Sequence, residues 1–235
     1  MKFGSTAATN VVVVSSTSIT ATTPAGSAGA VTVTVTVNGQ SGSLANGFTY
    51  AVAPTVTSVS PNSGSTAGGT AVTITGTNFV AGATVTFGSA AASNVVVVSA
   101  TSITATTPAG SAGAVTVTVT NPGSQSGSLA SGFTYVLLPT VTSVSPNNGS
   151  TAGGTAVTIT GTNFASGATV KFGSTAATNV VVVSATQITA TTPAGSAGAV
   201  TVTVTNSAGL SGSLANAFTY TNHRRRGAVS VPKGG

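Results

Sequence analysis

The chain has 235 residues, enough for two or three small domains, and it contains no Asp, Glu, Cys or Trp and a single His. Without carboxylates or thiols, paired-carboxylate catalysis, a Ser-His-Asp triad, thiolate metal sites and acidic calcium sites are excluded, so we expect no enzyme, no cofactor and no metal. The net charge of +6 is concentrated at the C-terminus, where Arg224, Arg225, Arg226 and Lys233 follow a nearly neutral body.

Three copies of one unit organise the chain. Residues 54–138 and 139–223 align without gaps and differ at 16 positions. Residues 1–53 match only the second part of the unit, from KFGS to FTY, and lack PTVTSVSP through TAVTITGTNF. The sequence therefore predicts a partial first repeat without its first strands (1–53), a complete middle repeat (54–138), a complete third repeat (139–221) and a basic, disordered tail (222–235).

The middle repeat shows how one unit is built. Valine and isoleucine alternate with threonine and serine between Gly- and Pro-rich turns, which predicts strands over 55–60, 71–75, 84–87, 94–99, 102–106 and 115–120, and a last strand through Phe133 and Tyr135. Residues 76–78 predict a bulge or tight bend that turns Phe79 into the core. The four consecutive valines at 95–98 have no period, and a strand covered on both faces is one interpretation.

About seven short strands in a unit of this length predict an all-β, antiparallel sandwich. The stretches PTVTSVSPNSGSTAGGTAVTITGTNF, VTFG, ITATTPAG, VTVTVTN and GFTY occur in this order and recur in the third repeat. Together they resemble the IPT/TIG domain family, whose fold plexins and transcription factors share. The resemblance implies tandem immunoglobulin-like sandwiches of the early set. It also implies, for bacterial chains, tandem units in secreted and cell-surface proteins.

The leading hypothesis is a non-catalytic structural or adhesive module of a bacterial extracellular or cell-surface protein, acting as stalk or interaction domains. We expect neighbouring repeats as partners, and a protein or carbohydrate ligand at the turn loops, although no residue marks such a site. No apolar run reaches the length of a membrane span, and no export signal is visible. The alternative is a nucleic-acid-associated module that binds through Arg224, Arg225 and Arg226. The absence of interleaved aromatic residues and of a second basic patch speaks against it.

The partial first repeat raises a separate question. Without the first strands, the valines of residues 31–37, Phe48 and Tyr50 lose the partners that Val72 and Ile74 supply in the middle repeat. Such an open edge should fray, aggregate or recruit a strand. Either the chain is a fragment of a longer repeat array, which we favour because the tail GAVSVPK resembles neither missing strand, or another molecule supplies the strands. The second reading makes the chain a strand-complemented subunit of a self-assembling fibre.

Overall fold

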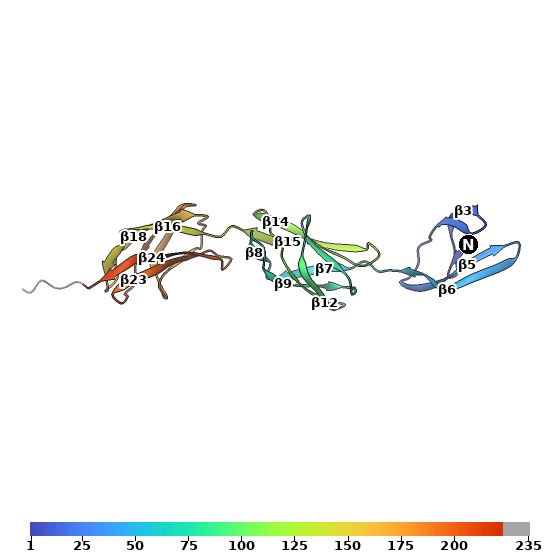
Figure 1. Cartoon of the computed structure of the whole chain (residues 1–235), viewed down its shortest axis with the longest axis horizontal. Helices are drawn as coiled ribbons and strands as arrows, with labels where there is room; N and C mark the ends of the chain where they lie inside the picture. The colour runs from blue at the N-terminus through green and yellow to red at the C-terminus, as the bar shows by residue number, and fades with distance from the viewer. Residues whose placement is uncertain (223–235) are drawn as a thin grey trace, which may run out of the picture. The chain divides into compact units, whose positions relative to one another are not determined.

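The third repeat shows the complete unit in the computed structural model, which describes residues 1–222 (Figure 1). One sheet has the order β16-β18-β22-β21 and the other the order β17-β24-β23-β19-β20. Neighbouring strands are antiparallel except β17, which runs parallel to β24. The strands are β16 (Thr140–Ser145), β17 (Asn148–Ser150), β18 (Ala156–Thr162), β19 (Thr169–Phe172), β20 (Thr175–Ala176), β21 (Thr178–Ser184), β22 (Gln187–Thr191), β23 (Gly198–Thr205) and β24 (Ser211–Thr221).

The core of this repeat lies between its two sheets. Alternation of valine with threonine gives each strand one apolar face, and these faces meet. At the centre, the Phe218 ring lies edge-on to Phe172, with centroids 5.2 Å apart, and to Tyr220, with centroids 5.0 Å apart. The buried residues of the cluster are Val141, Val144, Val157, Ile159, Phe164, Ala168, Val170, Phe172, Ile188, Ala190, Val202, Val204, Ala217, Phe218 and Tyr220.

The middle repeat has the same two sheets, with the orders β12-β13-β9-β7 and β11-β10-β14-β15-β8. The predicted strands are confirmed, and sequence reasoning missed only the short β8 and β11. Phe79 is buried, as predicted. The strands are β7 (Thr55–Ser60), β8 (Ser63–Ser65), β9 (Ala71–Thr77), β10 (Thr84–Phe87), β11 (Ala90–Ala91), β12 (Ser93–Ser99), β13 (Ser102–Thr106), β14 (Gly113–Thr120) and β15 (Ser126–Val136).

Two residues, Gly76 and Asn78, have different roles at the bend predicted near the end of β9. Asn78 has a φ of +59°, in the left-handed region that asparagine tolerates better than most residues, and it turns the chain. Gly76 remains inside the strand, where a Cβ would overlap the carbonyl oxygen of Thr55 on β7. Glycine is therefore required at position 76 by the close approach of a neighbouring strand.

The interpretation of residues 95–98 as a strand covered on both faces is wrong. They belong to β12, which lies at the edge of its sheet. Val96 and Val98 face outward, and Val98 is 62% exposed. The third repeat repeats this arrangement with Val181 and Val183 on the edge strand β21. Four valines in a row therefore cover the core with one face and leave the other in solvent.

The first repeat contains β1 (Lys2–Phe3), β2 (Thr6–Ala7), β3 (Thr9–Ser15), β4 (Ser18–Thr22), β5 (Gly29–Val37) and β6 (Gln40–Tyr50). They form a four-stranded sheet with the order β2-β1-β5-β6 and a separate pair, β3-β4. The described residues of the chain include no helix that could cross a membrane. The arginines at 224–226 and most of the predicted basic tail lie outside the described residues.

A tyrosine near the end of the middle and third repeats is hydrogen-bonded to the loop that precedes the next-to-last strand. The Tyr220 hydroxyl donates a hydrogen bond of 2.8 Å to the carbonyl oxygen of Pro193, and Tyr135 and Pro108 repeat it at 2.8 Å in the middle repeat. Gly195 packs so closely on the Tyr220 ring that a Cβ would not fit. Burial raises the pKa of Tyr220 and of Tyr135 above the ordinary value of 10.0.

These buried tyrosines predict a loss of stability in strong base. Because the folded state holds the Tyr220 proton more tightly than the unfolded chain, this group's stabilisation is complete below about pH 10 and is lost as the pH rises further. One proton limits the slope to about 1.4 kcal/mol per pH unit. Urea unfolding of the chain between pH 8 and 11.5 measures it, with Tyr220→Phe as the comparison. A slope above pH 10 that is equal in the two proteins would contradict the assignment.

Candidate functional site

The first repeat lacks the strands that complete a sheet on each side of the core. In the third repeat β18 pairs with β22, which places Ile159 opposite Ile188, and β17 pairs with β24. The counterparts of β22 and β24 in the first repeat are β4 and β6. Within the residues that the structure describes, neither is paired with a strand equivalent to β18 or β17. One edge of each sheet is therefore open.

Core side chains of the first repeat are correspondingly exposed. Ile188 has no accessible surface, whereas its counterpart Ile19 is half-buried. Phe218 is likewise fully buried, and its counterpart Phe48 is half-buried. Leu44 is 65% exposed. The partial repeat thus keeps the fold of its remaining strands and presents an apolar surface to solvent.

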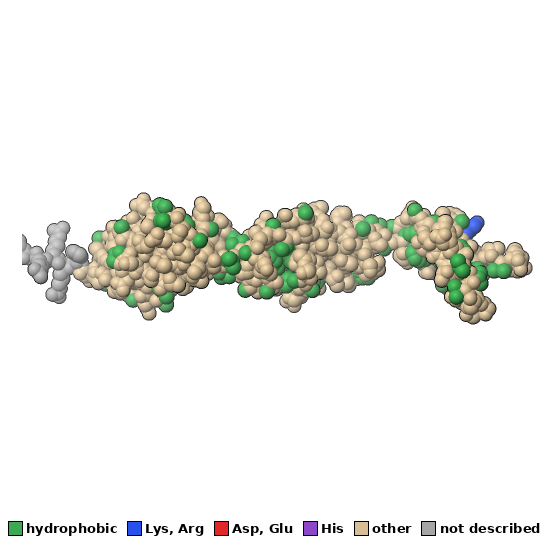
Figure 2. Space-filling view, turned by 90° about the horizontal axis from the view of Figure 1, so that it is seen from above, with side chains coloured by type: hydrophobic (Ala, Val, Ile, Leu, Met, Phe, Trp, Pro, Cys, Tyr) green, Lys and Arg blue, Asp and Glu red, His purple; other side chains and the backbone are tan. Residues whose placement is uncertain are grey.

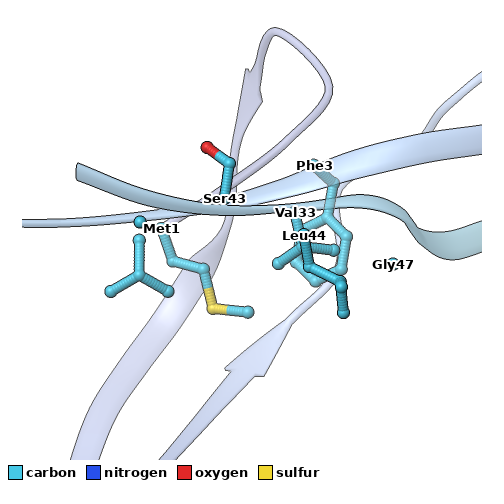
Figure 3. Close-up of a pocket in the computed structure, with 8 residues that line it drawn as sticks. Met1, Phe3, Val33, Ser43, Leu44 and Gly47 are labelled. Atoms are coloured by element: carbon cyan, nitrogen blue, oxygen red, sulfur yellow. The ribbon is translucent and has the colours of Figure 1, made fainter.

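A groove of about 520 Å³ lies on this surface (Figure 3). Met1, Val33 and Leu44 point to one side of the sheet, and Ser43 points to the other. On that other side, the hydroxyls of Thr34 and Ser43 lie 3.0 Å apart and form a hydrogen bond. The groove is lined by Met1, Phe3, Val33, Val35, Gly42, Ser43, Leu44 and Gly47. We refer to these eight residues as the open groove.

Gly42 lies where the complete repeats have a glycine facing the start of the first strand. In the complete repeats its counterparts are Gly127 and Gly212, where a Cβ would overlap the carbonyl oxygens of Pro54 and Pro139. Each of these prolines directly precedes the first strand of its repeat. At Gly42 a Cβ would meet nothing within 4 Å. The open groove therefore keeps the space that the start of a first strand occupies elsewhere in the chain.

A second, polar depression recurs in the first and third repeats. In the third it has a volume of about 540 Å³ and lies between Ser174 of the β19–β20 turn, Thr175 of β20 and the loop that carries Ser196. Phe172 and Tyr220 also line it. Its counterpart in the first repeat, of about 330 Å³, includes Ser5, Thr6 and Ser27. Hydroxyls beside aromatic rings suit a neutral polar ligand, but no sequence motif distinguishes these residues from ordinary turn residues.

Charged side chains are few on the surface of the described residues. Figure 2 shows a face on which uncharged polar side chains and backbone predominate, with scattered hydrophobic side chains. Lys2 and Lys171 are the lysines of residues 1–222, and no group of three or more metal-ligating side chains occurs among these residues. The site proposed from sequence for nucleic acid or anions, Arg224, Arg225 and Arg226, lies outside them and stays a prediction.

The model of the IPT/TIG domain matches this chain three times, at residues 1–50, 54–135 and 139–220. The chain belongs to the IPT/TIG family. Its repeats are tandem immunoglobulin-like β-sandwiches, as the sequence predicted. IPT/TIG domains are typically non-catalytic modules, and this chain is a tandem array of them. No curated protein matches it.

Several solved structures resemble parts of this IPT/TIG chain. The extracellular region of plexin A4 is 27% identical with a TM-score of 0.39, and the match covers 72% of this chain and 18% of that one. SGBP-B from a xyloglucan utilization locus of Bacteroides uniformis is 23% identical with a TM-score of 0.33, covering 72% and 50%. Invasin, a bacterial integrin-binding protein, is 19% identical with a TM-score of 0.28, covering 87% and 48%. The match thus spans half or less of each of these proteins.

The glycine comparison predicts opposite results for one substitution in two repeats. Gly212→Ala should destabilise the third repeat by about 1–3 kcal/mol, because the new methyl group overlaps the Pro139 carbonyl. Gly42→Ala should change the first repeat by less than about 1 kcal/mol, because its methyl group enters open space. Native-state hydrogen exchange measures each repeat through its own amides, on β5 and β6 or on β23 and β24. Equal losses in both variants would show that the groove is closed in solution.

Proposed function

We propose that the chain is a non-catalytic structural and interaction module of a bacterial extracellular or cell-surface protein, acting as stalk or adhesive repeats. The observation that carries this proposal is the repetition of one neutral sandwich, with the same buried core and few ionisable groups, in consecutive units. An enzyme that moves protons needs groups that titrate in its site, and this chain has no carboxylate or thiol. The family favours the same conclusion, since bacterial IPT/TIG units typically occur in tandem in such proteins.

The linkers support a load-bearing role. Residues 51–53 and 136–138 are apolar and short, unlike flexible Gly/Ser linkers. The last linker residue is also fixed to the repeat that follows. The Asn163 side-chain amide donates a 2.8 Å hydrogen bond to the carbonyl oxygen of Leu138, and Asn78 donates one of 3.2 Å to Ala53. Each repeat therefore holds the chain segment that enters it.

Ligand binding, if the module is adhesive, has a physical basis in the polar depressions of the first and third repeats. Ser174, Thr175 and Ser196 offer hydroxyl donors and acceptors without charge. Such groups match the hydroxyls of a neutral carbohydrate or the backbone of a peptide. We assign the depressions to uncharged ligands of these two kinds.

A stalk should resist extension one repeat at a time. Pulling the full chain from both ends should give two similar unfolding steps, each releasing about 25 nm of chain, from the middle and third repeats. Phe218→Ala removes a fully buried ring and should lower the force of one step only. Smooth extension without steps would contradict a load-bearing role.

The cellular location is tested separately. On intact cells of the organism that encodes the chain, added protease should remove the epitope of an antibody raised against the third repeat. A cytoplasmic protein in the same cells serves as the control and should stay intact. An epitope that is cut only after lysis would rule out exposure at the cell surface.

A further inference from the structure

We propose that Asn38 is a site of spontaneous deamidation, at which the chain acquires a side-chain carboxylate that its sequence lacks. Asn38 and Gly39 form the turn that joins β5 to β6 (Figure 1). The modified form would carry aspartate or isoaspartate in this turn. This inference does not depend on the proposed function, since it concerns the chemistry of a single turn.

The reaction takes place within the backbone of the Asn-Gly pair and consumes only water. The backbone nitrogen of Gly39 forms a bond to the side-chain carbonyl carbon of Asn38, and the side-chain nitrogen of Asn38 leaves as ammonia. Water then opens the resulting cyclic imide at either of its carbonyl groups. One product is aspartate, and the other is isoaspartate, in which the main chain continues through the side-chain carboxyl carbon. Glycine favours the attack because it has no side chain to obstruct it.

The β5–β6 turn leaves the reacting atoms accessible. The φ angles of Asn38 and Gly39, +51° and +80°, are those of a two-residue type I′ turn. Val37 pairs with Gln40, so the backbone ladder ends before the turn. Within residues 1–222, neither the Gly39 amide nor the Asn38 side chain forms a hydrogen bond. A Cβ at Gly39 would meet nothing within 4 Å outside the adjacent residues, so the peptide has room to rotate toward the Asn38 side chain.

The chain contains two other Asn-Gly pairs, at 46–47 and 148–149, which serve as internal comparisons. Gly149 belongs to β17 and pairs with Tyr220 of β24. Its carbonyl oxygen accepts a hydrogen bond of 3.1 Å from the Thr221 hydroxyl. Rotation of the peptide at Gly149 therefore requires β17 to separate from β24 first, which makes this pair less reactive in the folded chain.

The pair at 46–47 lies inside β6. Leu44 and Phe48, on either side of it, are both paired with β5. A Cβ on Gly47 would approach the carbonyl oxygen of Leu44 to 3.0 Å, so the backbone is also crowded there. Attack on Asn46 therefore requires local opening of the hairpin, whereas attack on Asn38 does not.

The corresponding turns of the other repeats do not present the reactive pair. In the middle repeat the turn begins at Asn121, which is buried and is followed by Pro122, whose nitrogen carries no hydrogen to lose. In the third repeat it begins at Asn206, which is buried as well. The side-chain oxygen of Asn206 accepts hydrogen bonds of 3.0 Å from the amides of Ala208 and Leu210. An exposed Asn-Gly turn is thus particular to the first repeat.

The products differ from the original turn in charge and in backbone length. The new carboxyl group is ionised at neutral pH, because its ordinary pKa is about 3.9, and it lowers the net charge of +6 by one. Isoaspartate also adds a carbon atom to the main chain of a turn that has only two residues. The pairing of Val37 with Gln40 and the 2.7 Å contact between the hydroxyls of Thr36 and Ser41 should then be lost.

The experiment ages the full chain in mildly alkaline buffer and measures deamidation at each Asn-Gly pair by mass spectrometry after chymotryptic digestion. Trypsin is unsuitable, because no lysine or arginine lies between Lys2 and Lys171 and all three pairs would remain in one peptide. Asn38 should react at least about tenfold faster than Asn46 and Asn148, which are held in paired strands. The control is the same chain in concentrated urea, where the three pairs should react at similar rates.

Comparable rates at the three pairs in the folded chain would overturn the assignment. An equally large preference for Asn38 in urea would overturn it too, since the preference would then come from the neighbouring sequence and not from the turn.

The consequence for the hairpin has its own measurement. Ion exchange separates the isoaspartate form, and Asn38→Asp is its matched control, because it carries the same charge on an unaltered backbone. Hydrogen exchange at the turn ends of β5 and β6 should accelerate in the isoaspartate form only. Equal protection in the two forms would show that the added backbone carbon leaves the hairpin intact and would overturn this part of the proposal.

Discussion

The architecture depends on the contact between the first strand pair of a repeat and the sheet that carries its aromatic residues. In the third repeat Ile159 of that pair lies opposite Ile188 of the neighbouring strand β22, and both are fully buried together with Phe218 of the other sheet. Valine and isoleucine pack there without polar atoms, while the threonines on the outer faces keep the strands soluble. Where the pair is present the core is closed. Where it is absent, the same residue types leave a groove.

The first repeat therefore shows which features of the core form without the first strands of the unit. Its remaining sheet keeps the aromatic arrangement of the complete repeats, with Phe3 and Phe48 at 5.1 Å and Phe48 and Tyr50 at 5.0 Å, edge to face. Tyr50 also keeps its hydrogen bond to Pro24, at 2.7 Å. The hairpin of β5 and β6 therefore keeps its structure without the first strands of the repeat. Full burial of the positions held by Phe48 and Ile19 occurs only in the repeats that contain those first strands.

Much of the fold could be predicted from the sequence because period-two alternation of valine and threonine leaves little ambiguity. The strands at Thr55–Ser60, Thr84–Phe87 and Ser102–Thr106 lie where the pattern placed them. The short β8 could not be predicted, since its Ser-Gly-Ser sequence has no alternation and its pairing with β15 is set by the tertiary structure. The interpretation of the valine run of β12 was wrong for a related reason. Four identical residues carry no information about which face is covered.

Only part of the candidate site could be predicted from the sequence. Self-comparison predicted an open core in the first repeat, where Leu44 is 65% exposed. The role of Gly42 was hidden, because a glycine in an SGS stretch looks like any strand glycine until the backbone that approaches its counterpart Gly212 is known. The polar depression beside Ser174 was hidden too, since it joins two turns that are distant in the sequence.

The near identity of residues 54–79 and 139–164, which differ only at Ser63 and Asn148, has a consequence for biosynthesis. Residues 54–79 are synthesised directly after residues 1–53 and before the rest of the middle repeat. During that interval they lack their own partners, β10 to β15, and they are next in sequence to a repeat whose described residues leave a similar edge open. Correct pairing then depends on the later strands, β10 to β15, folding fast enough to pair with residues 54–79.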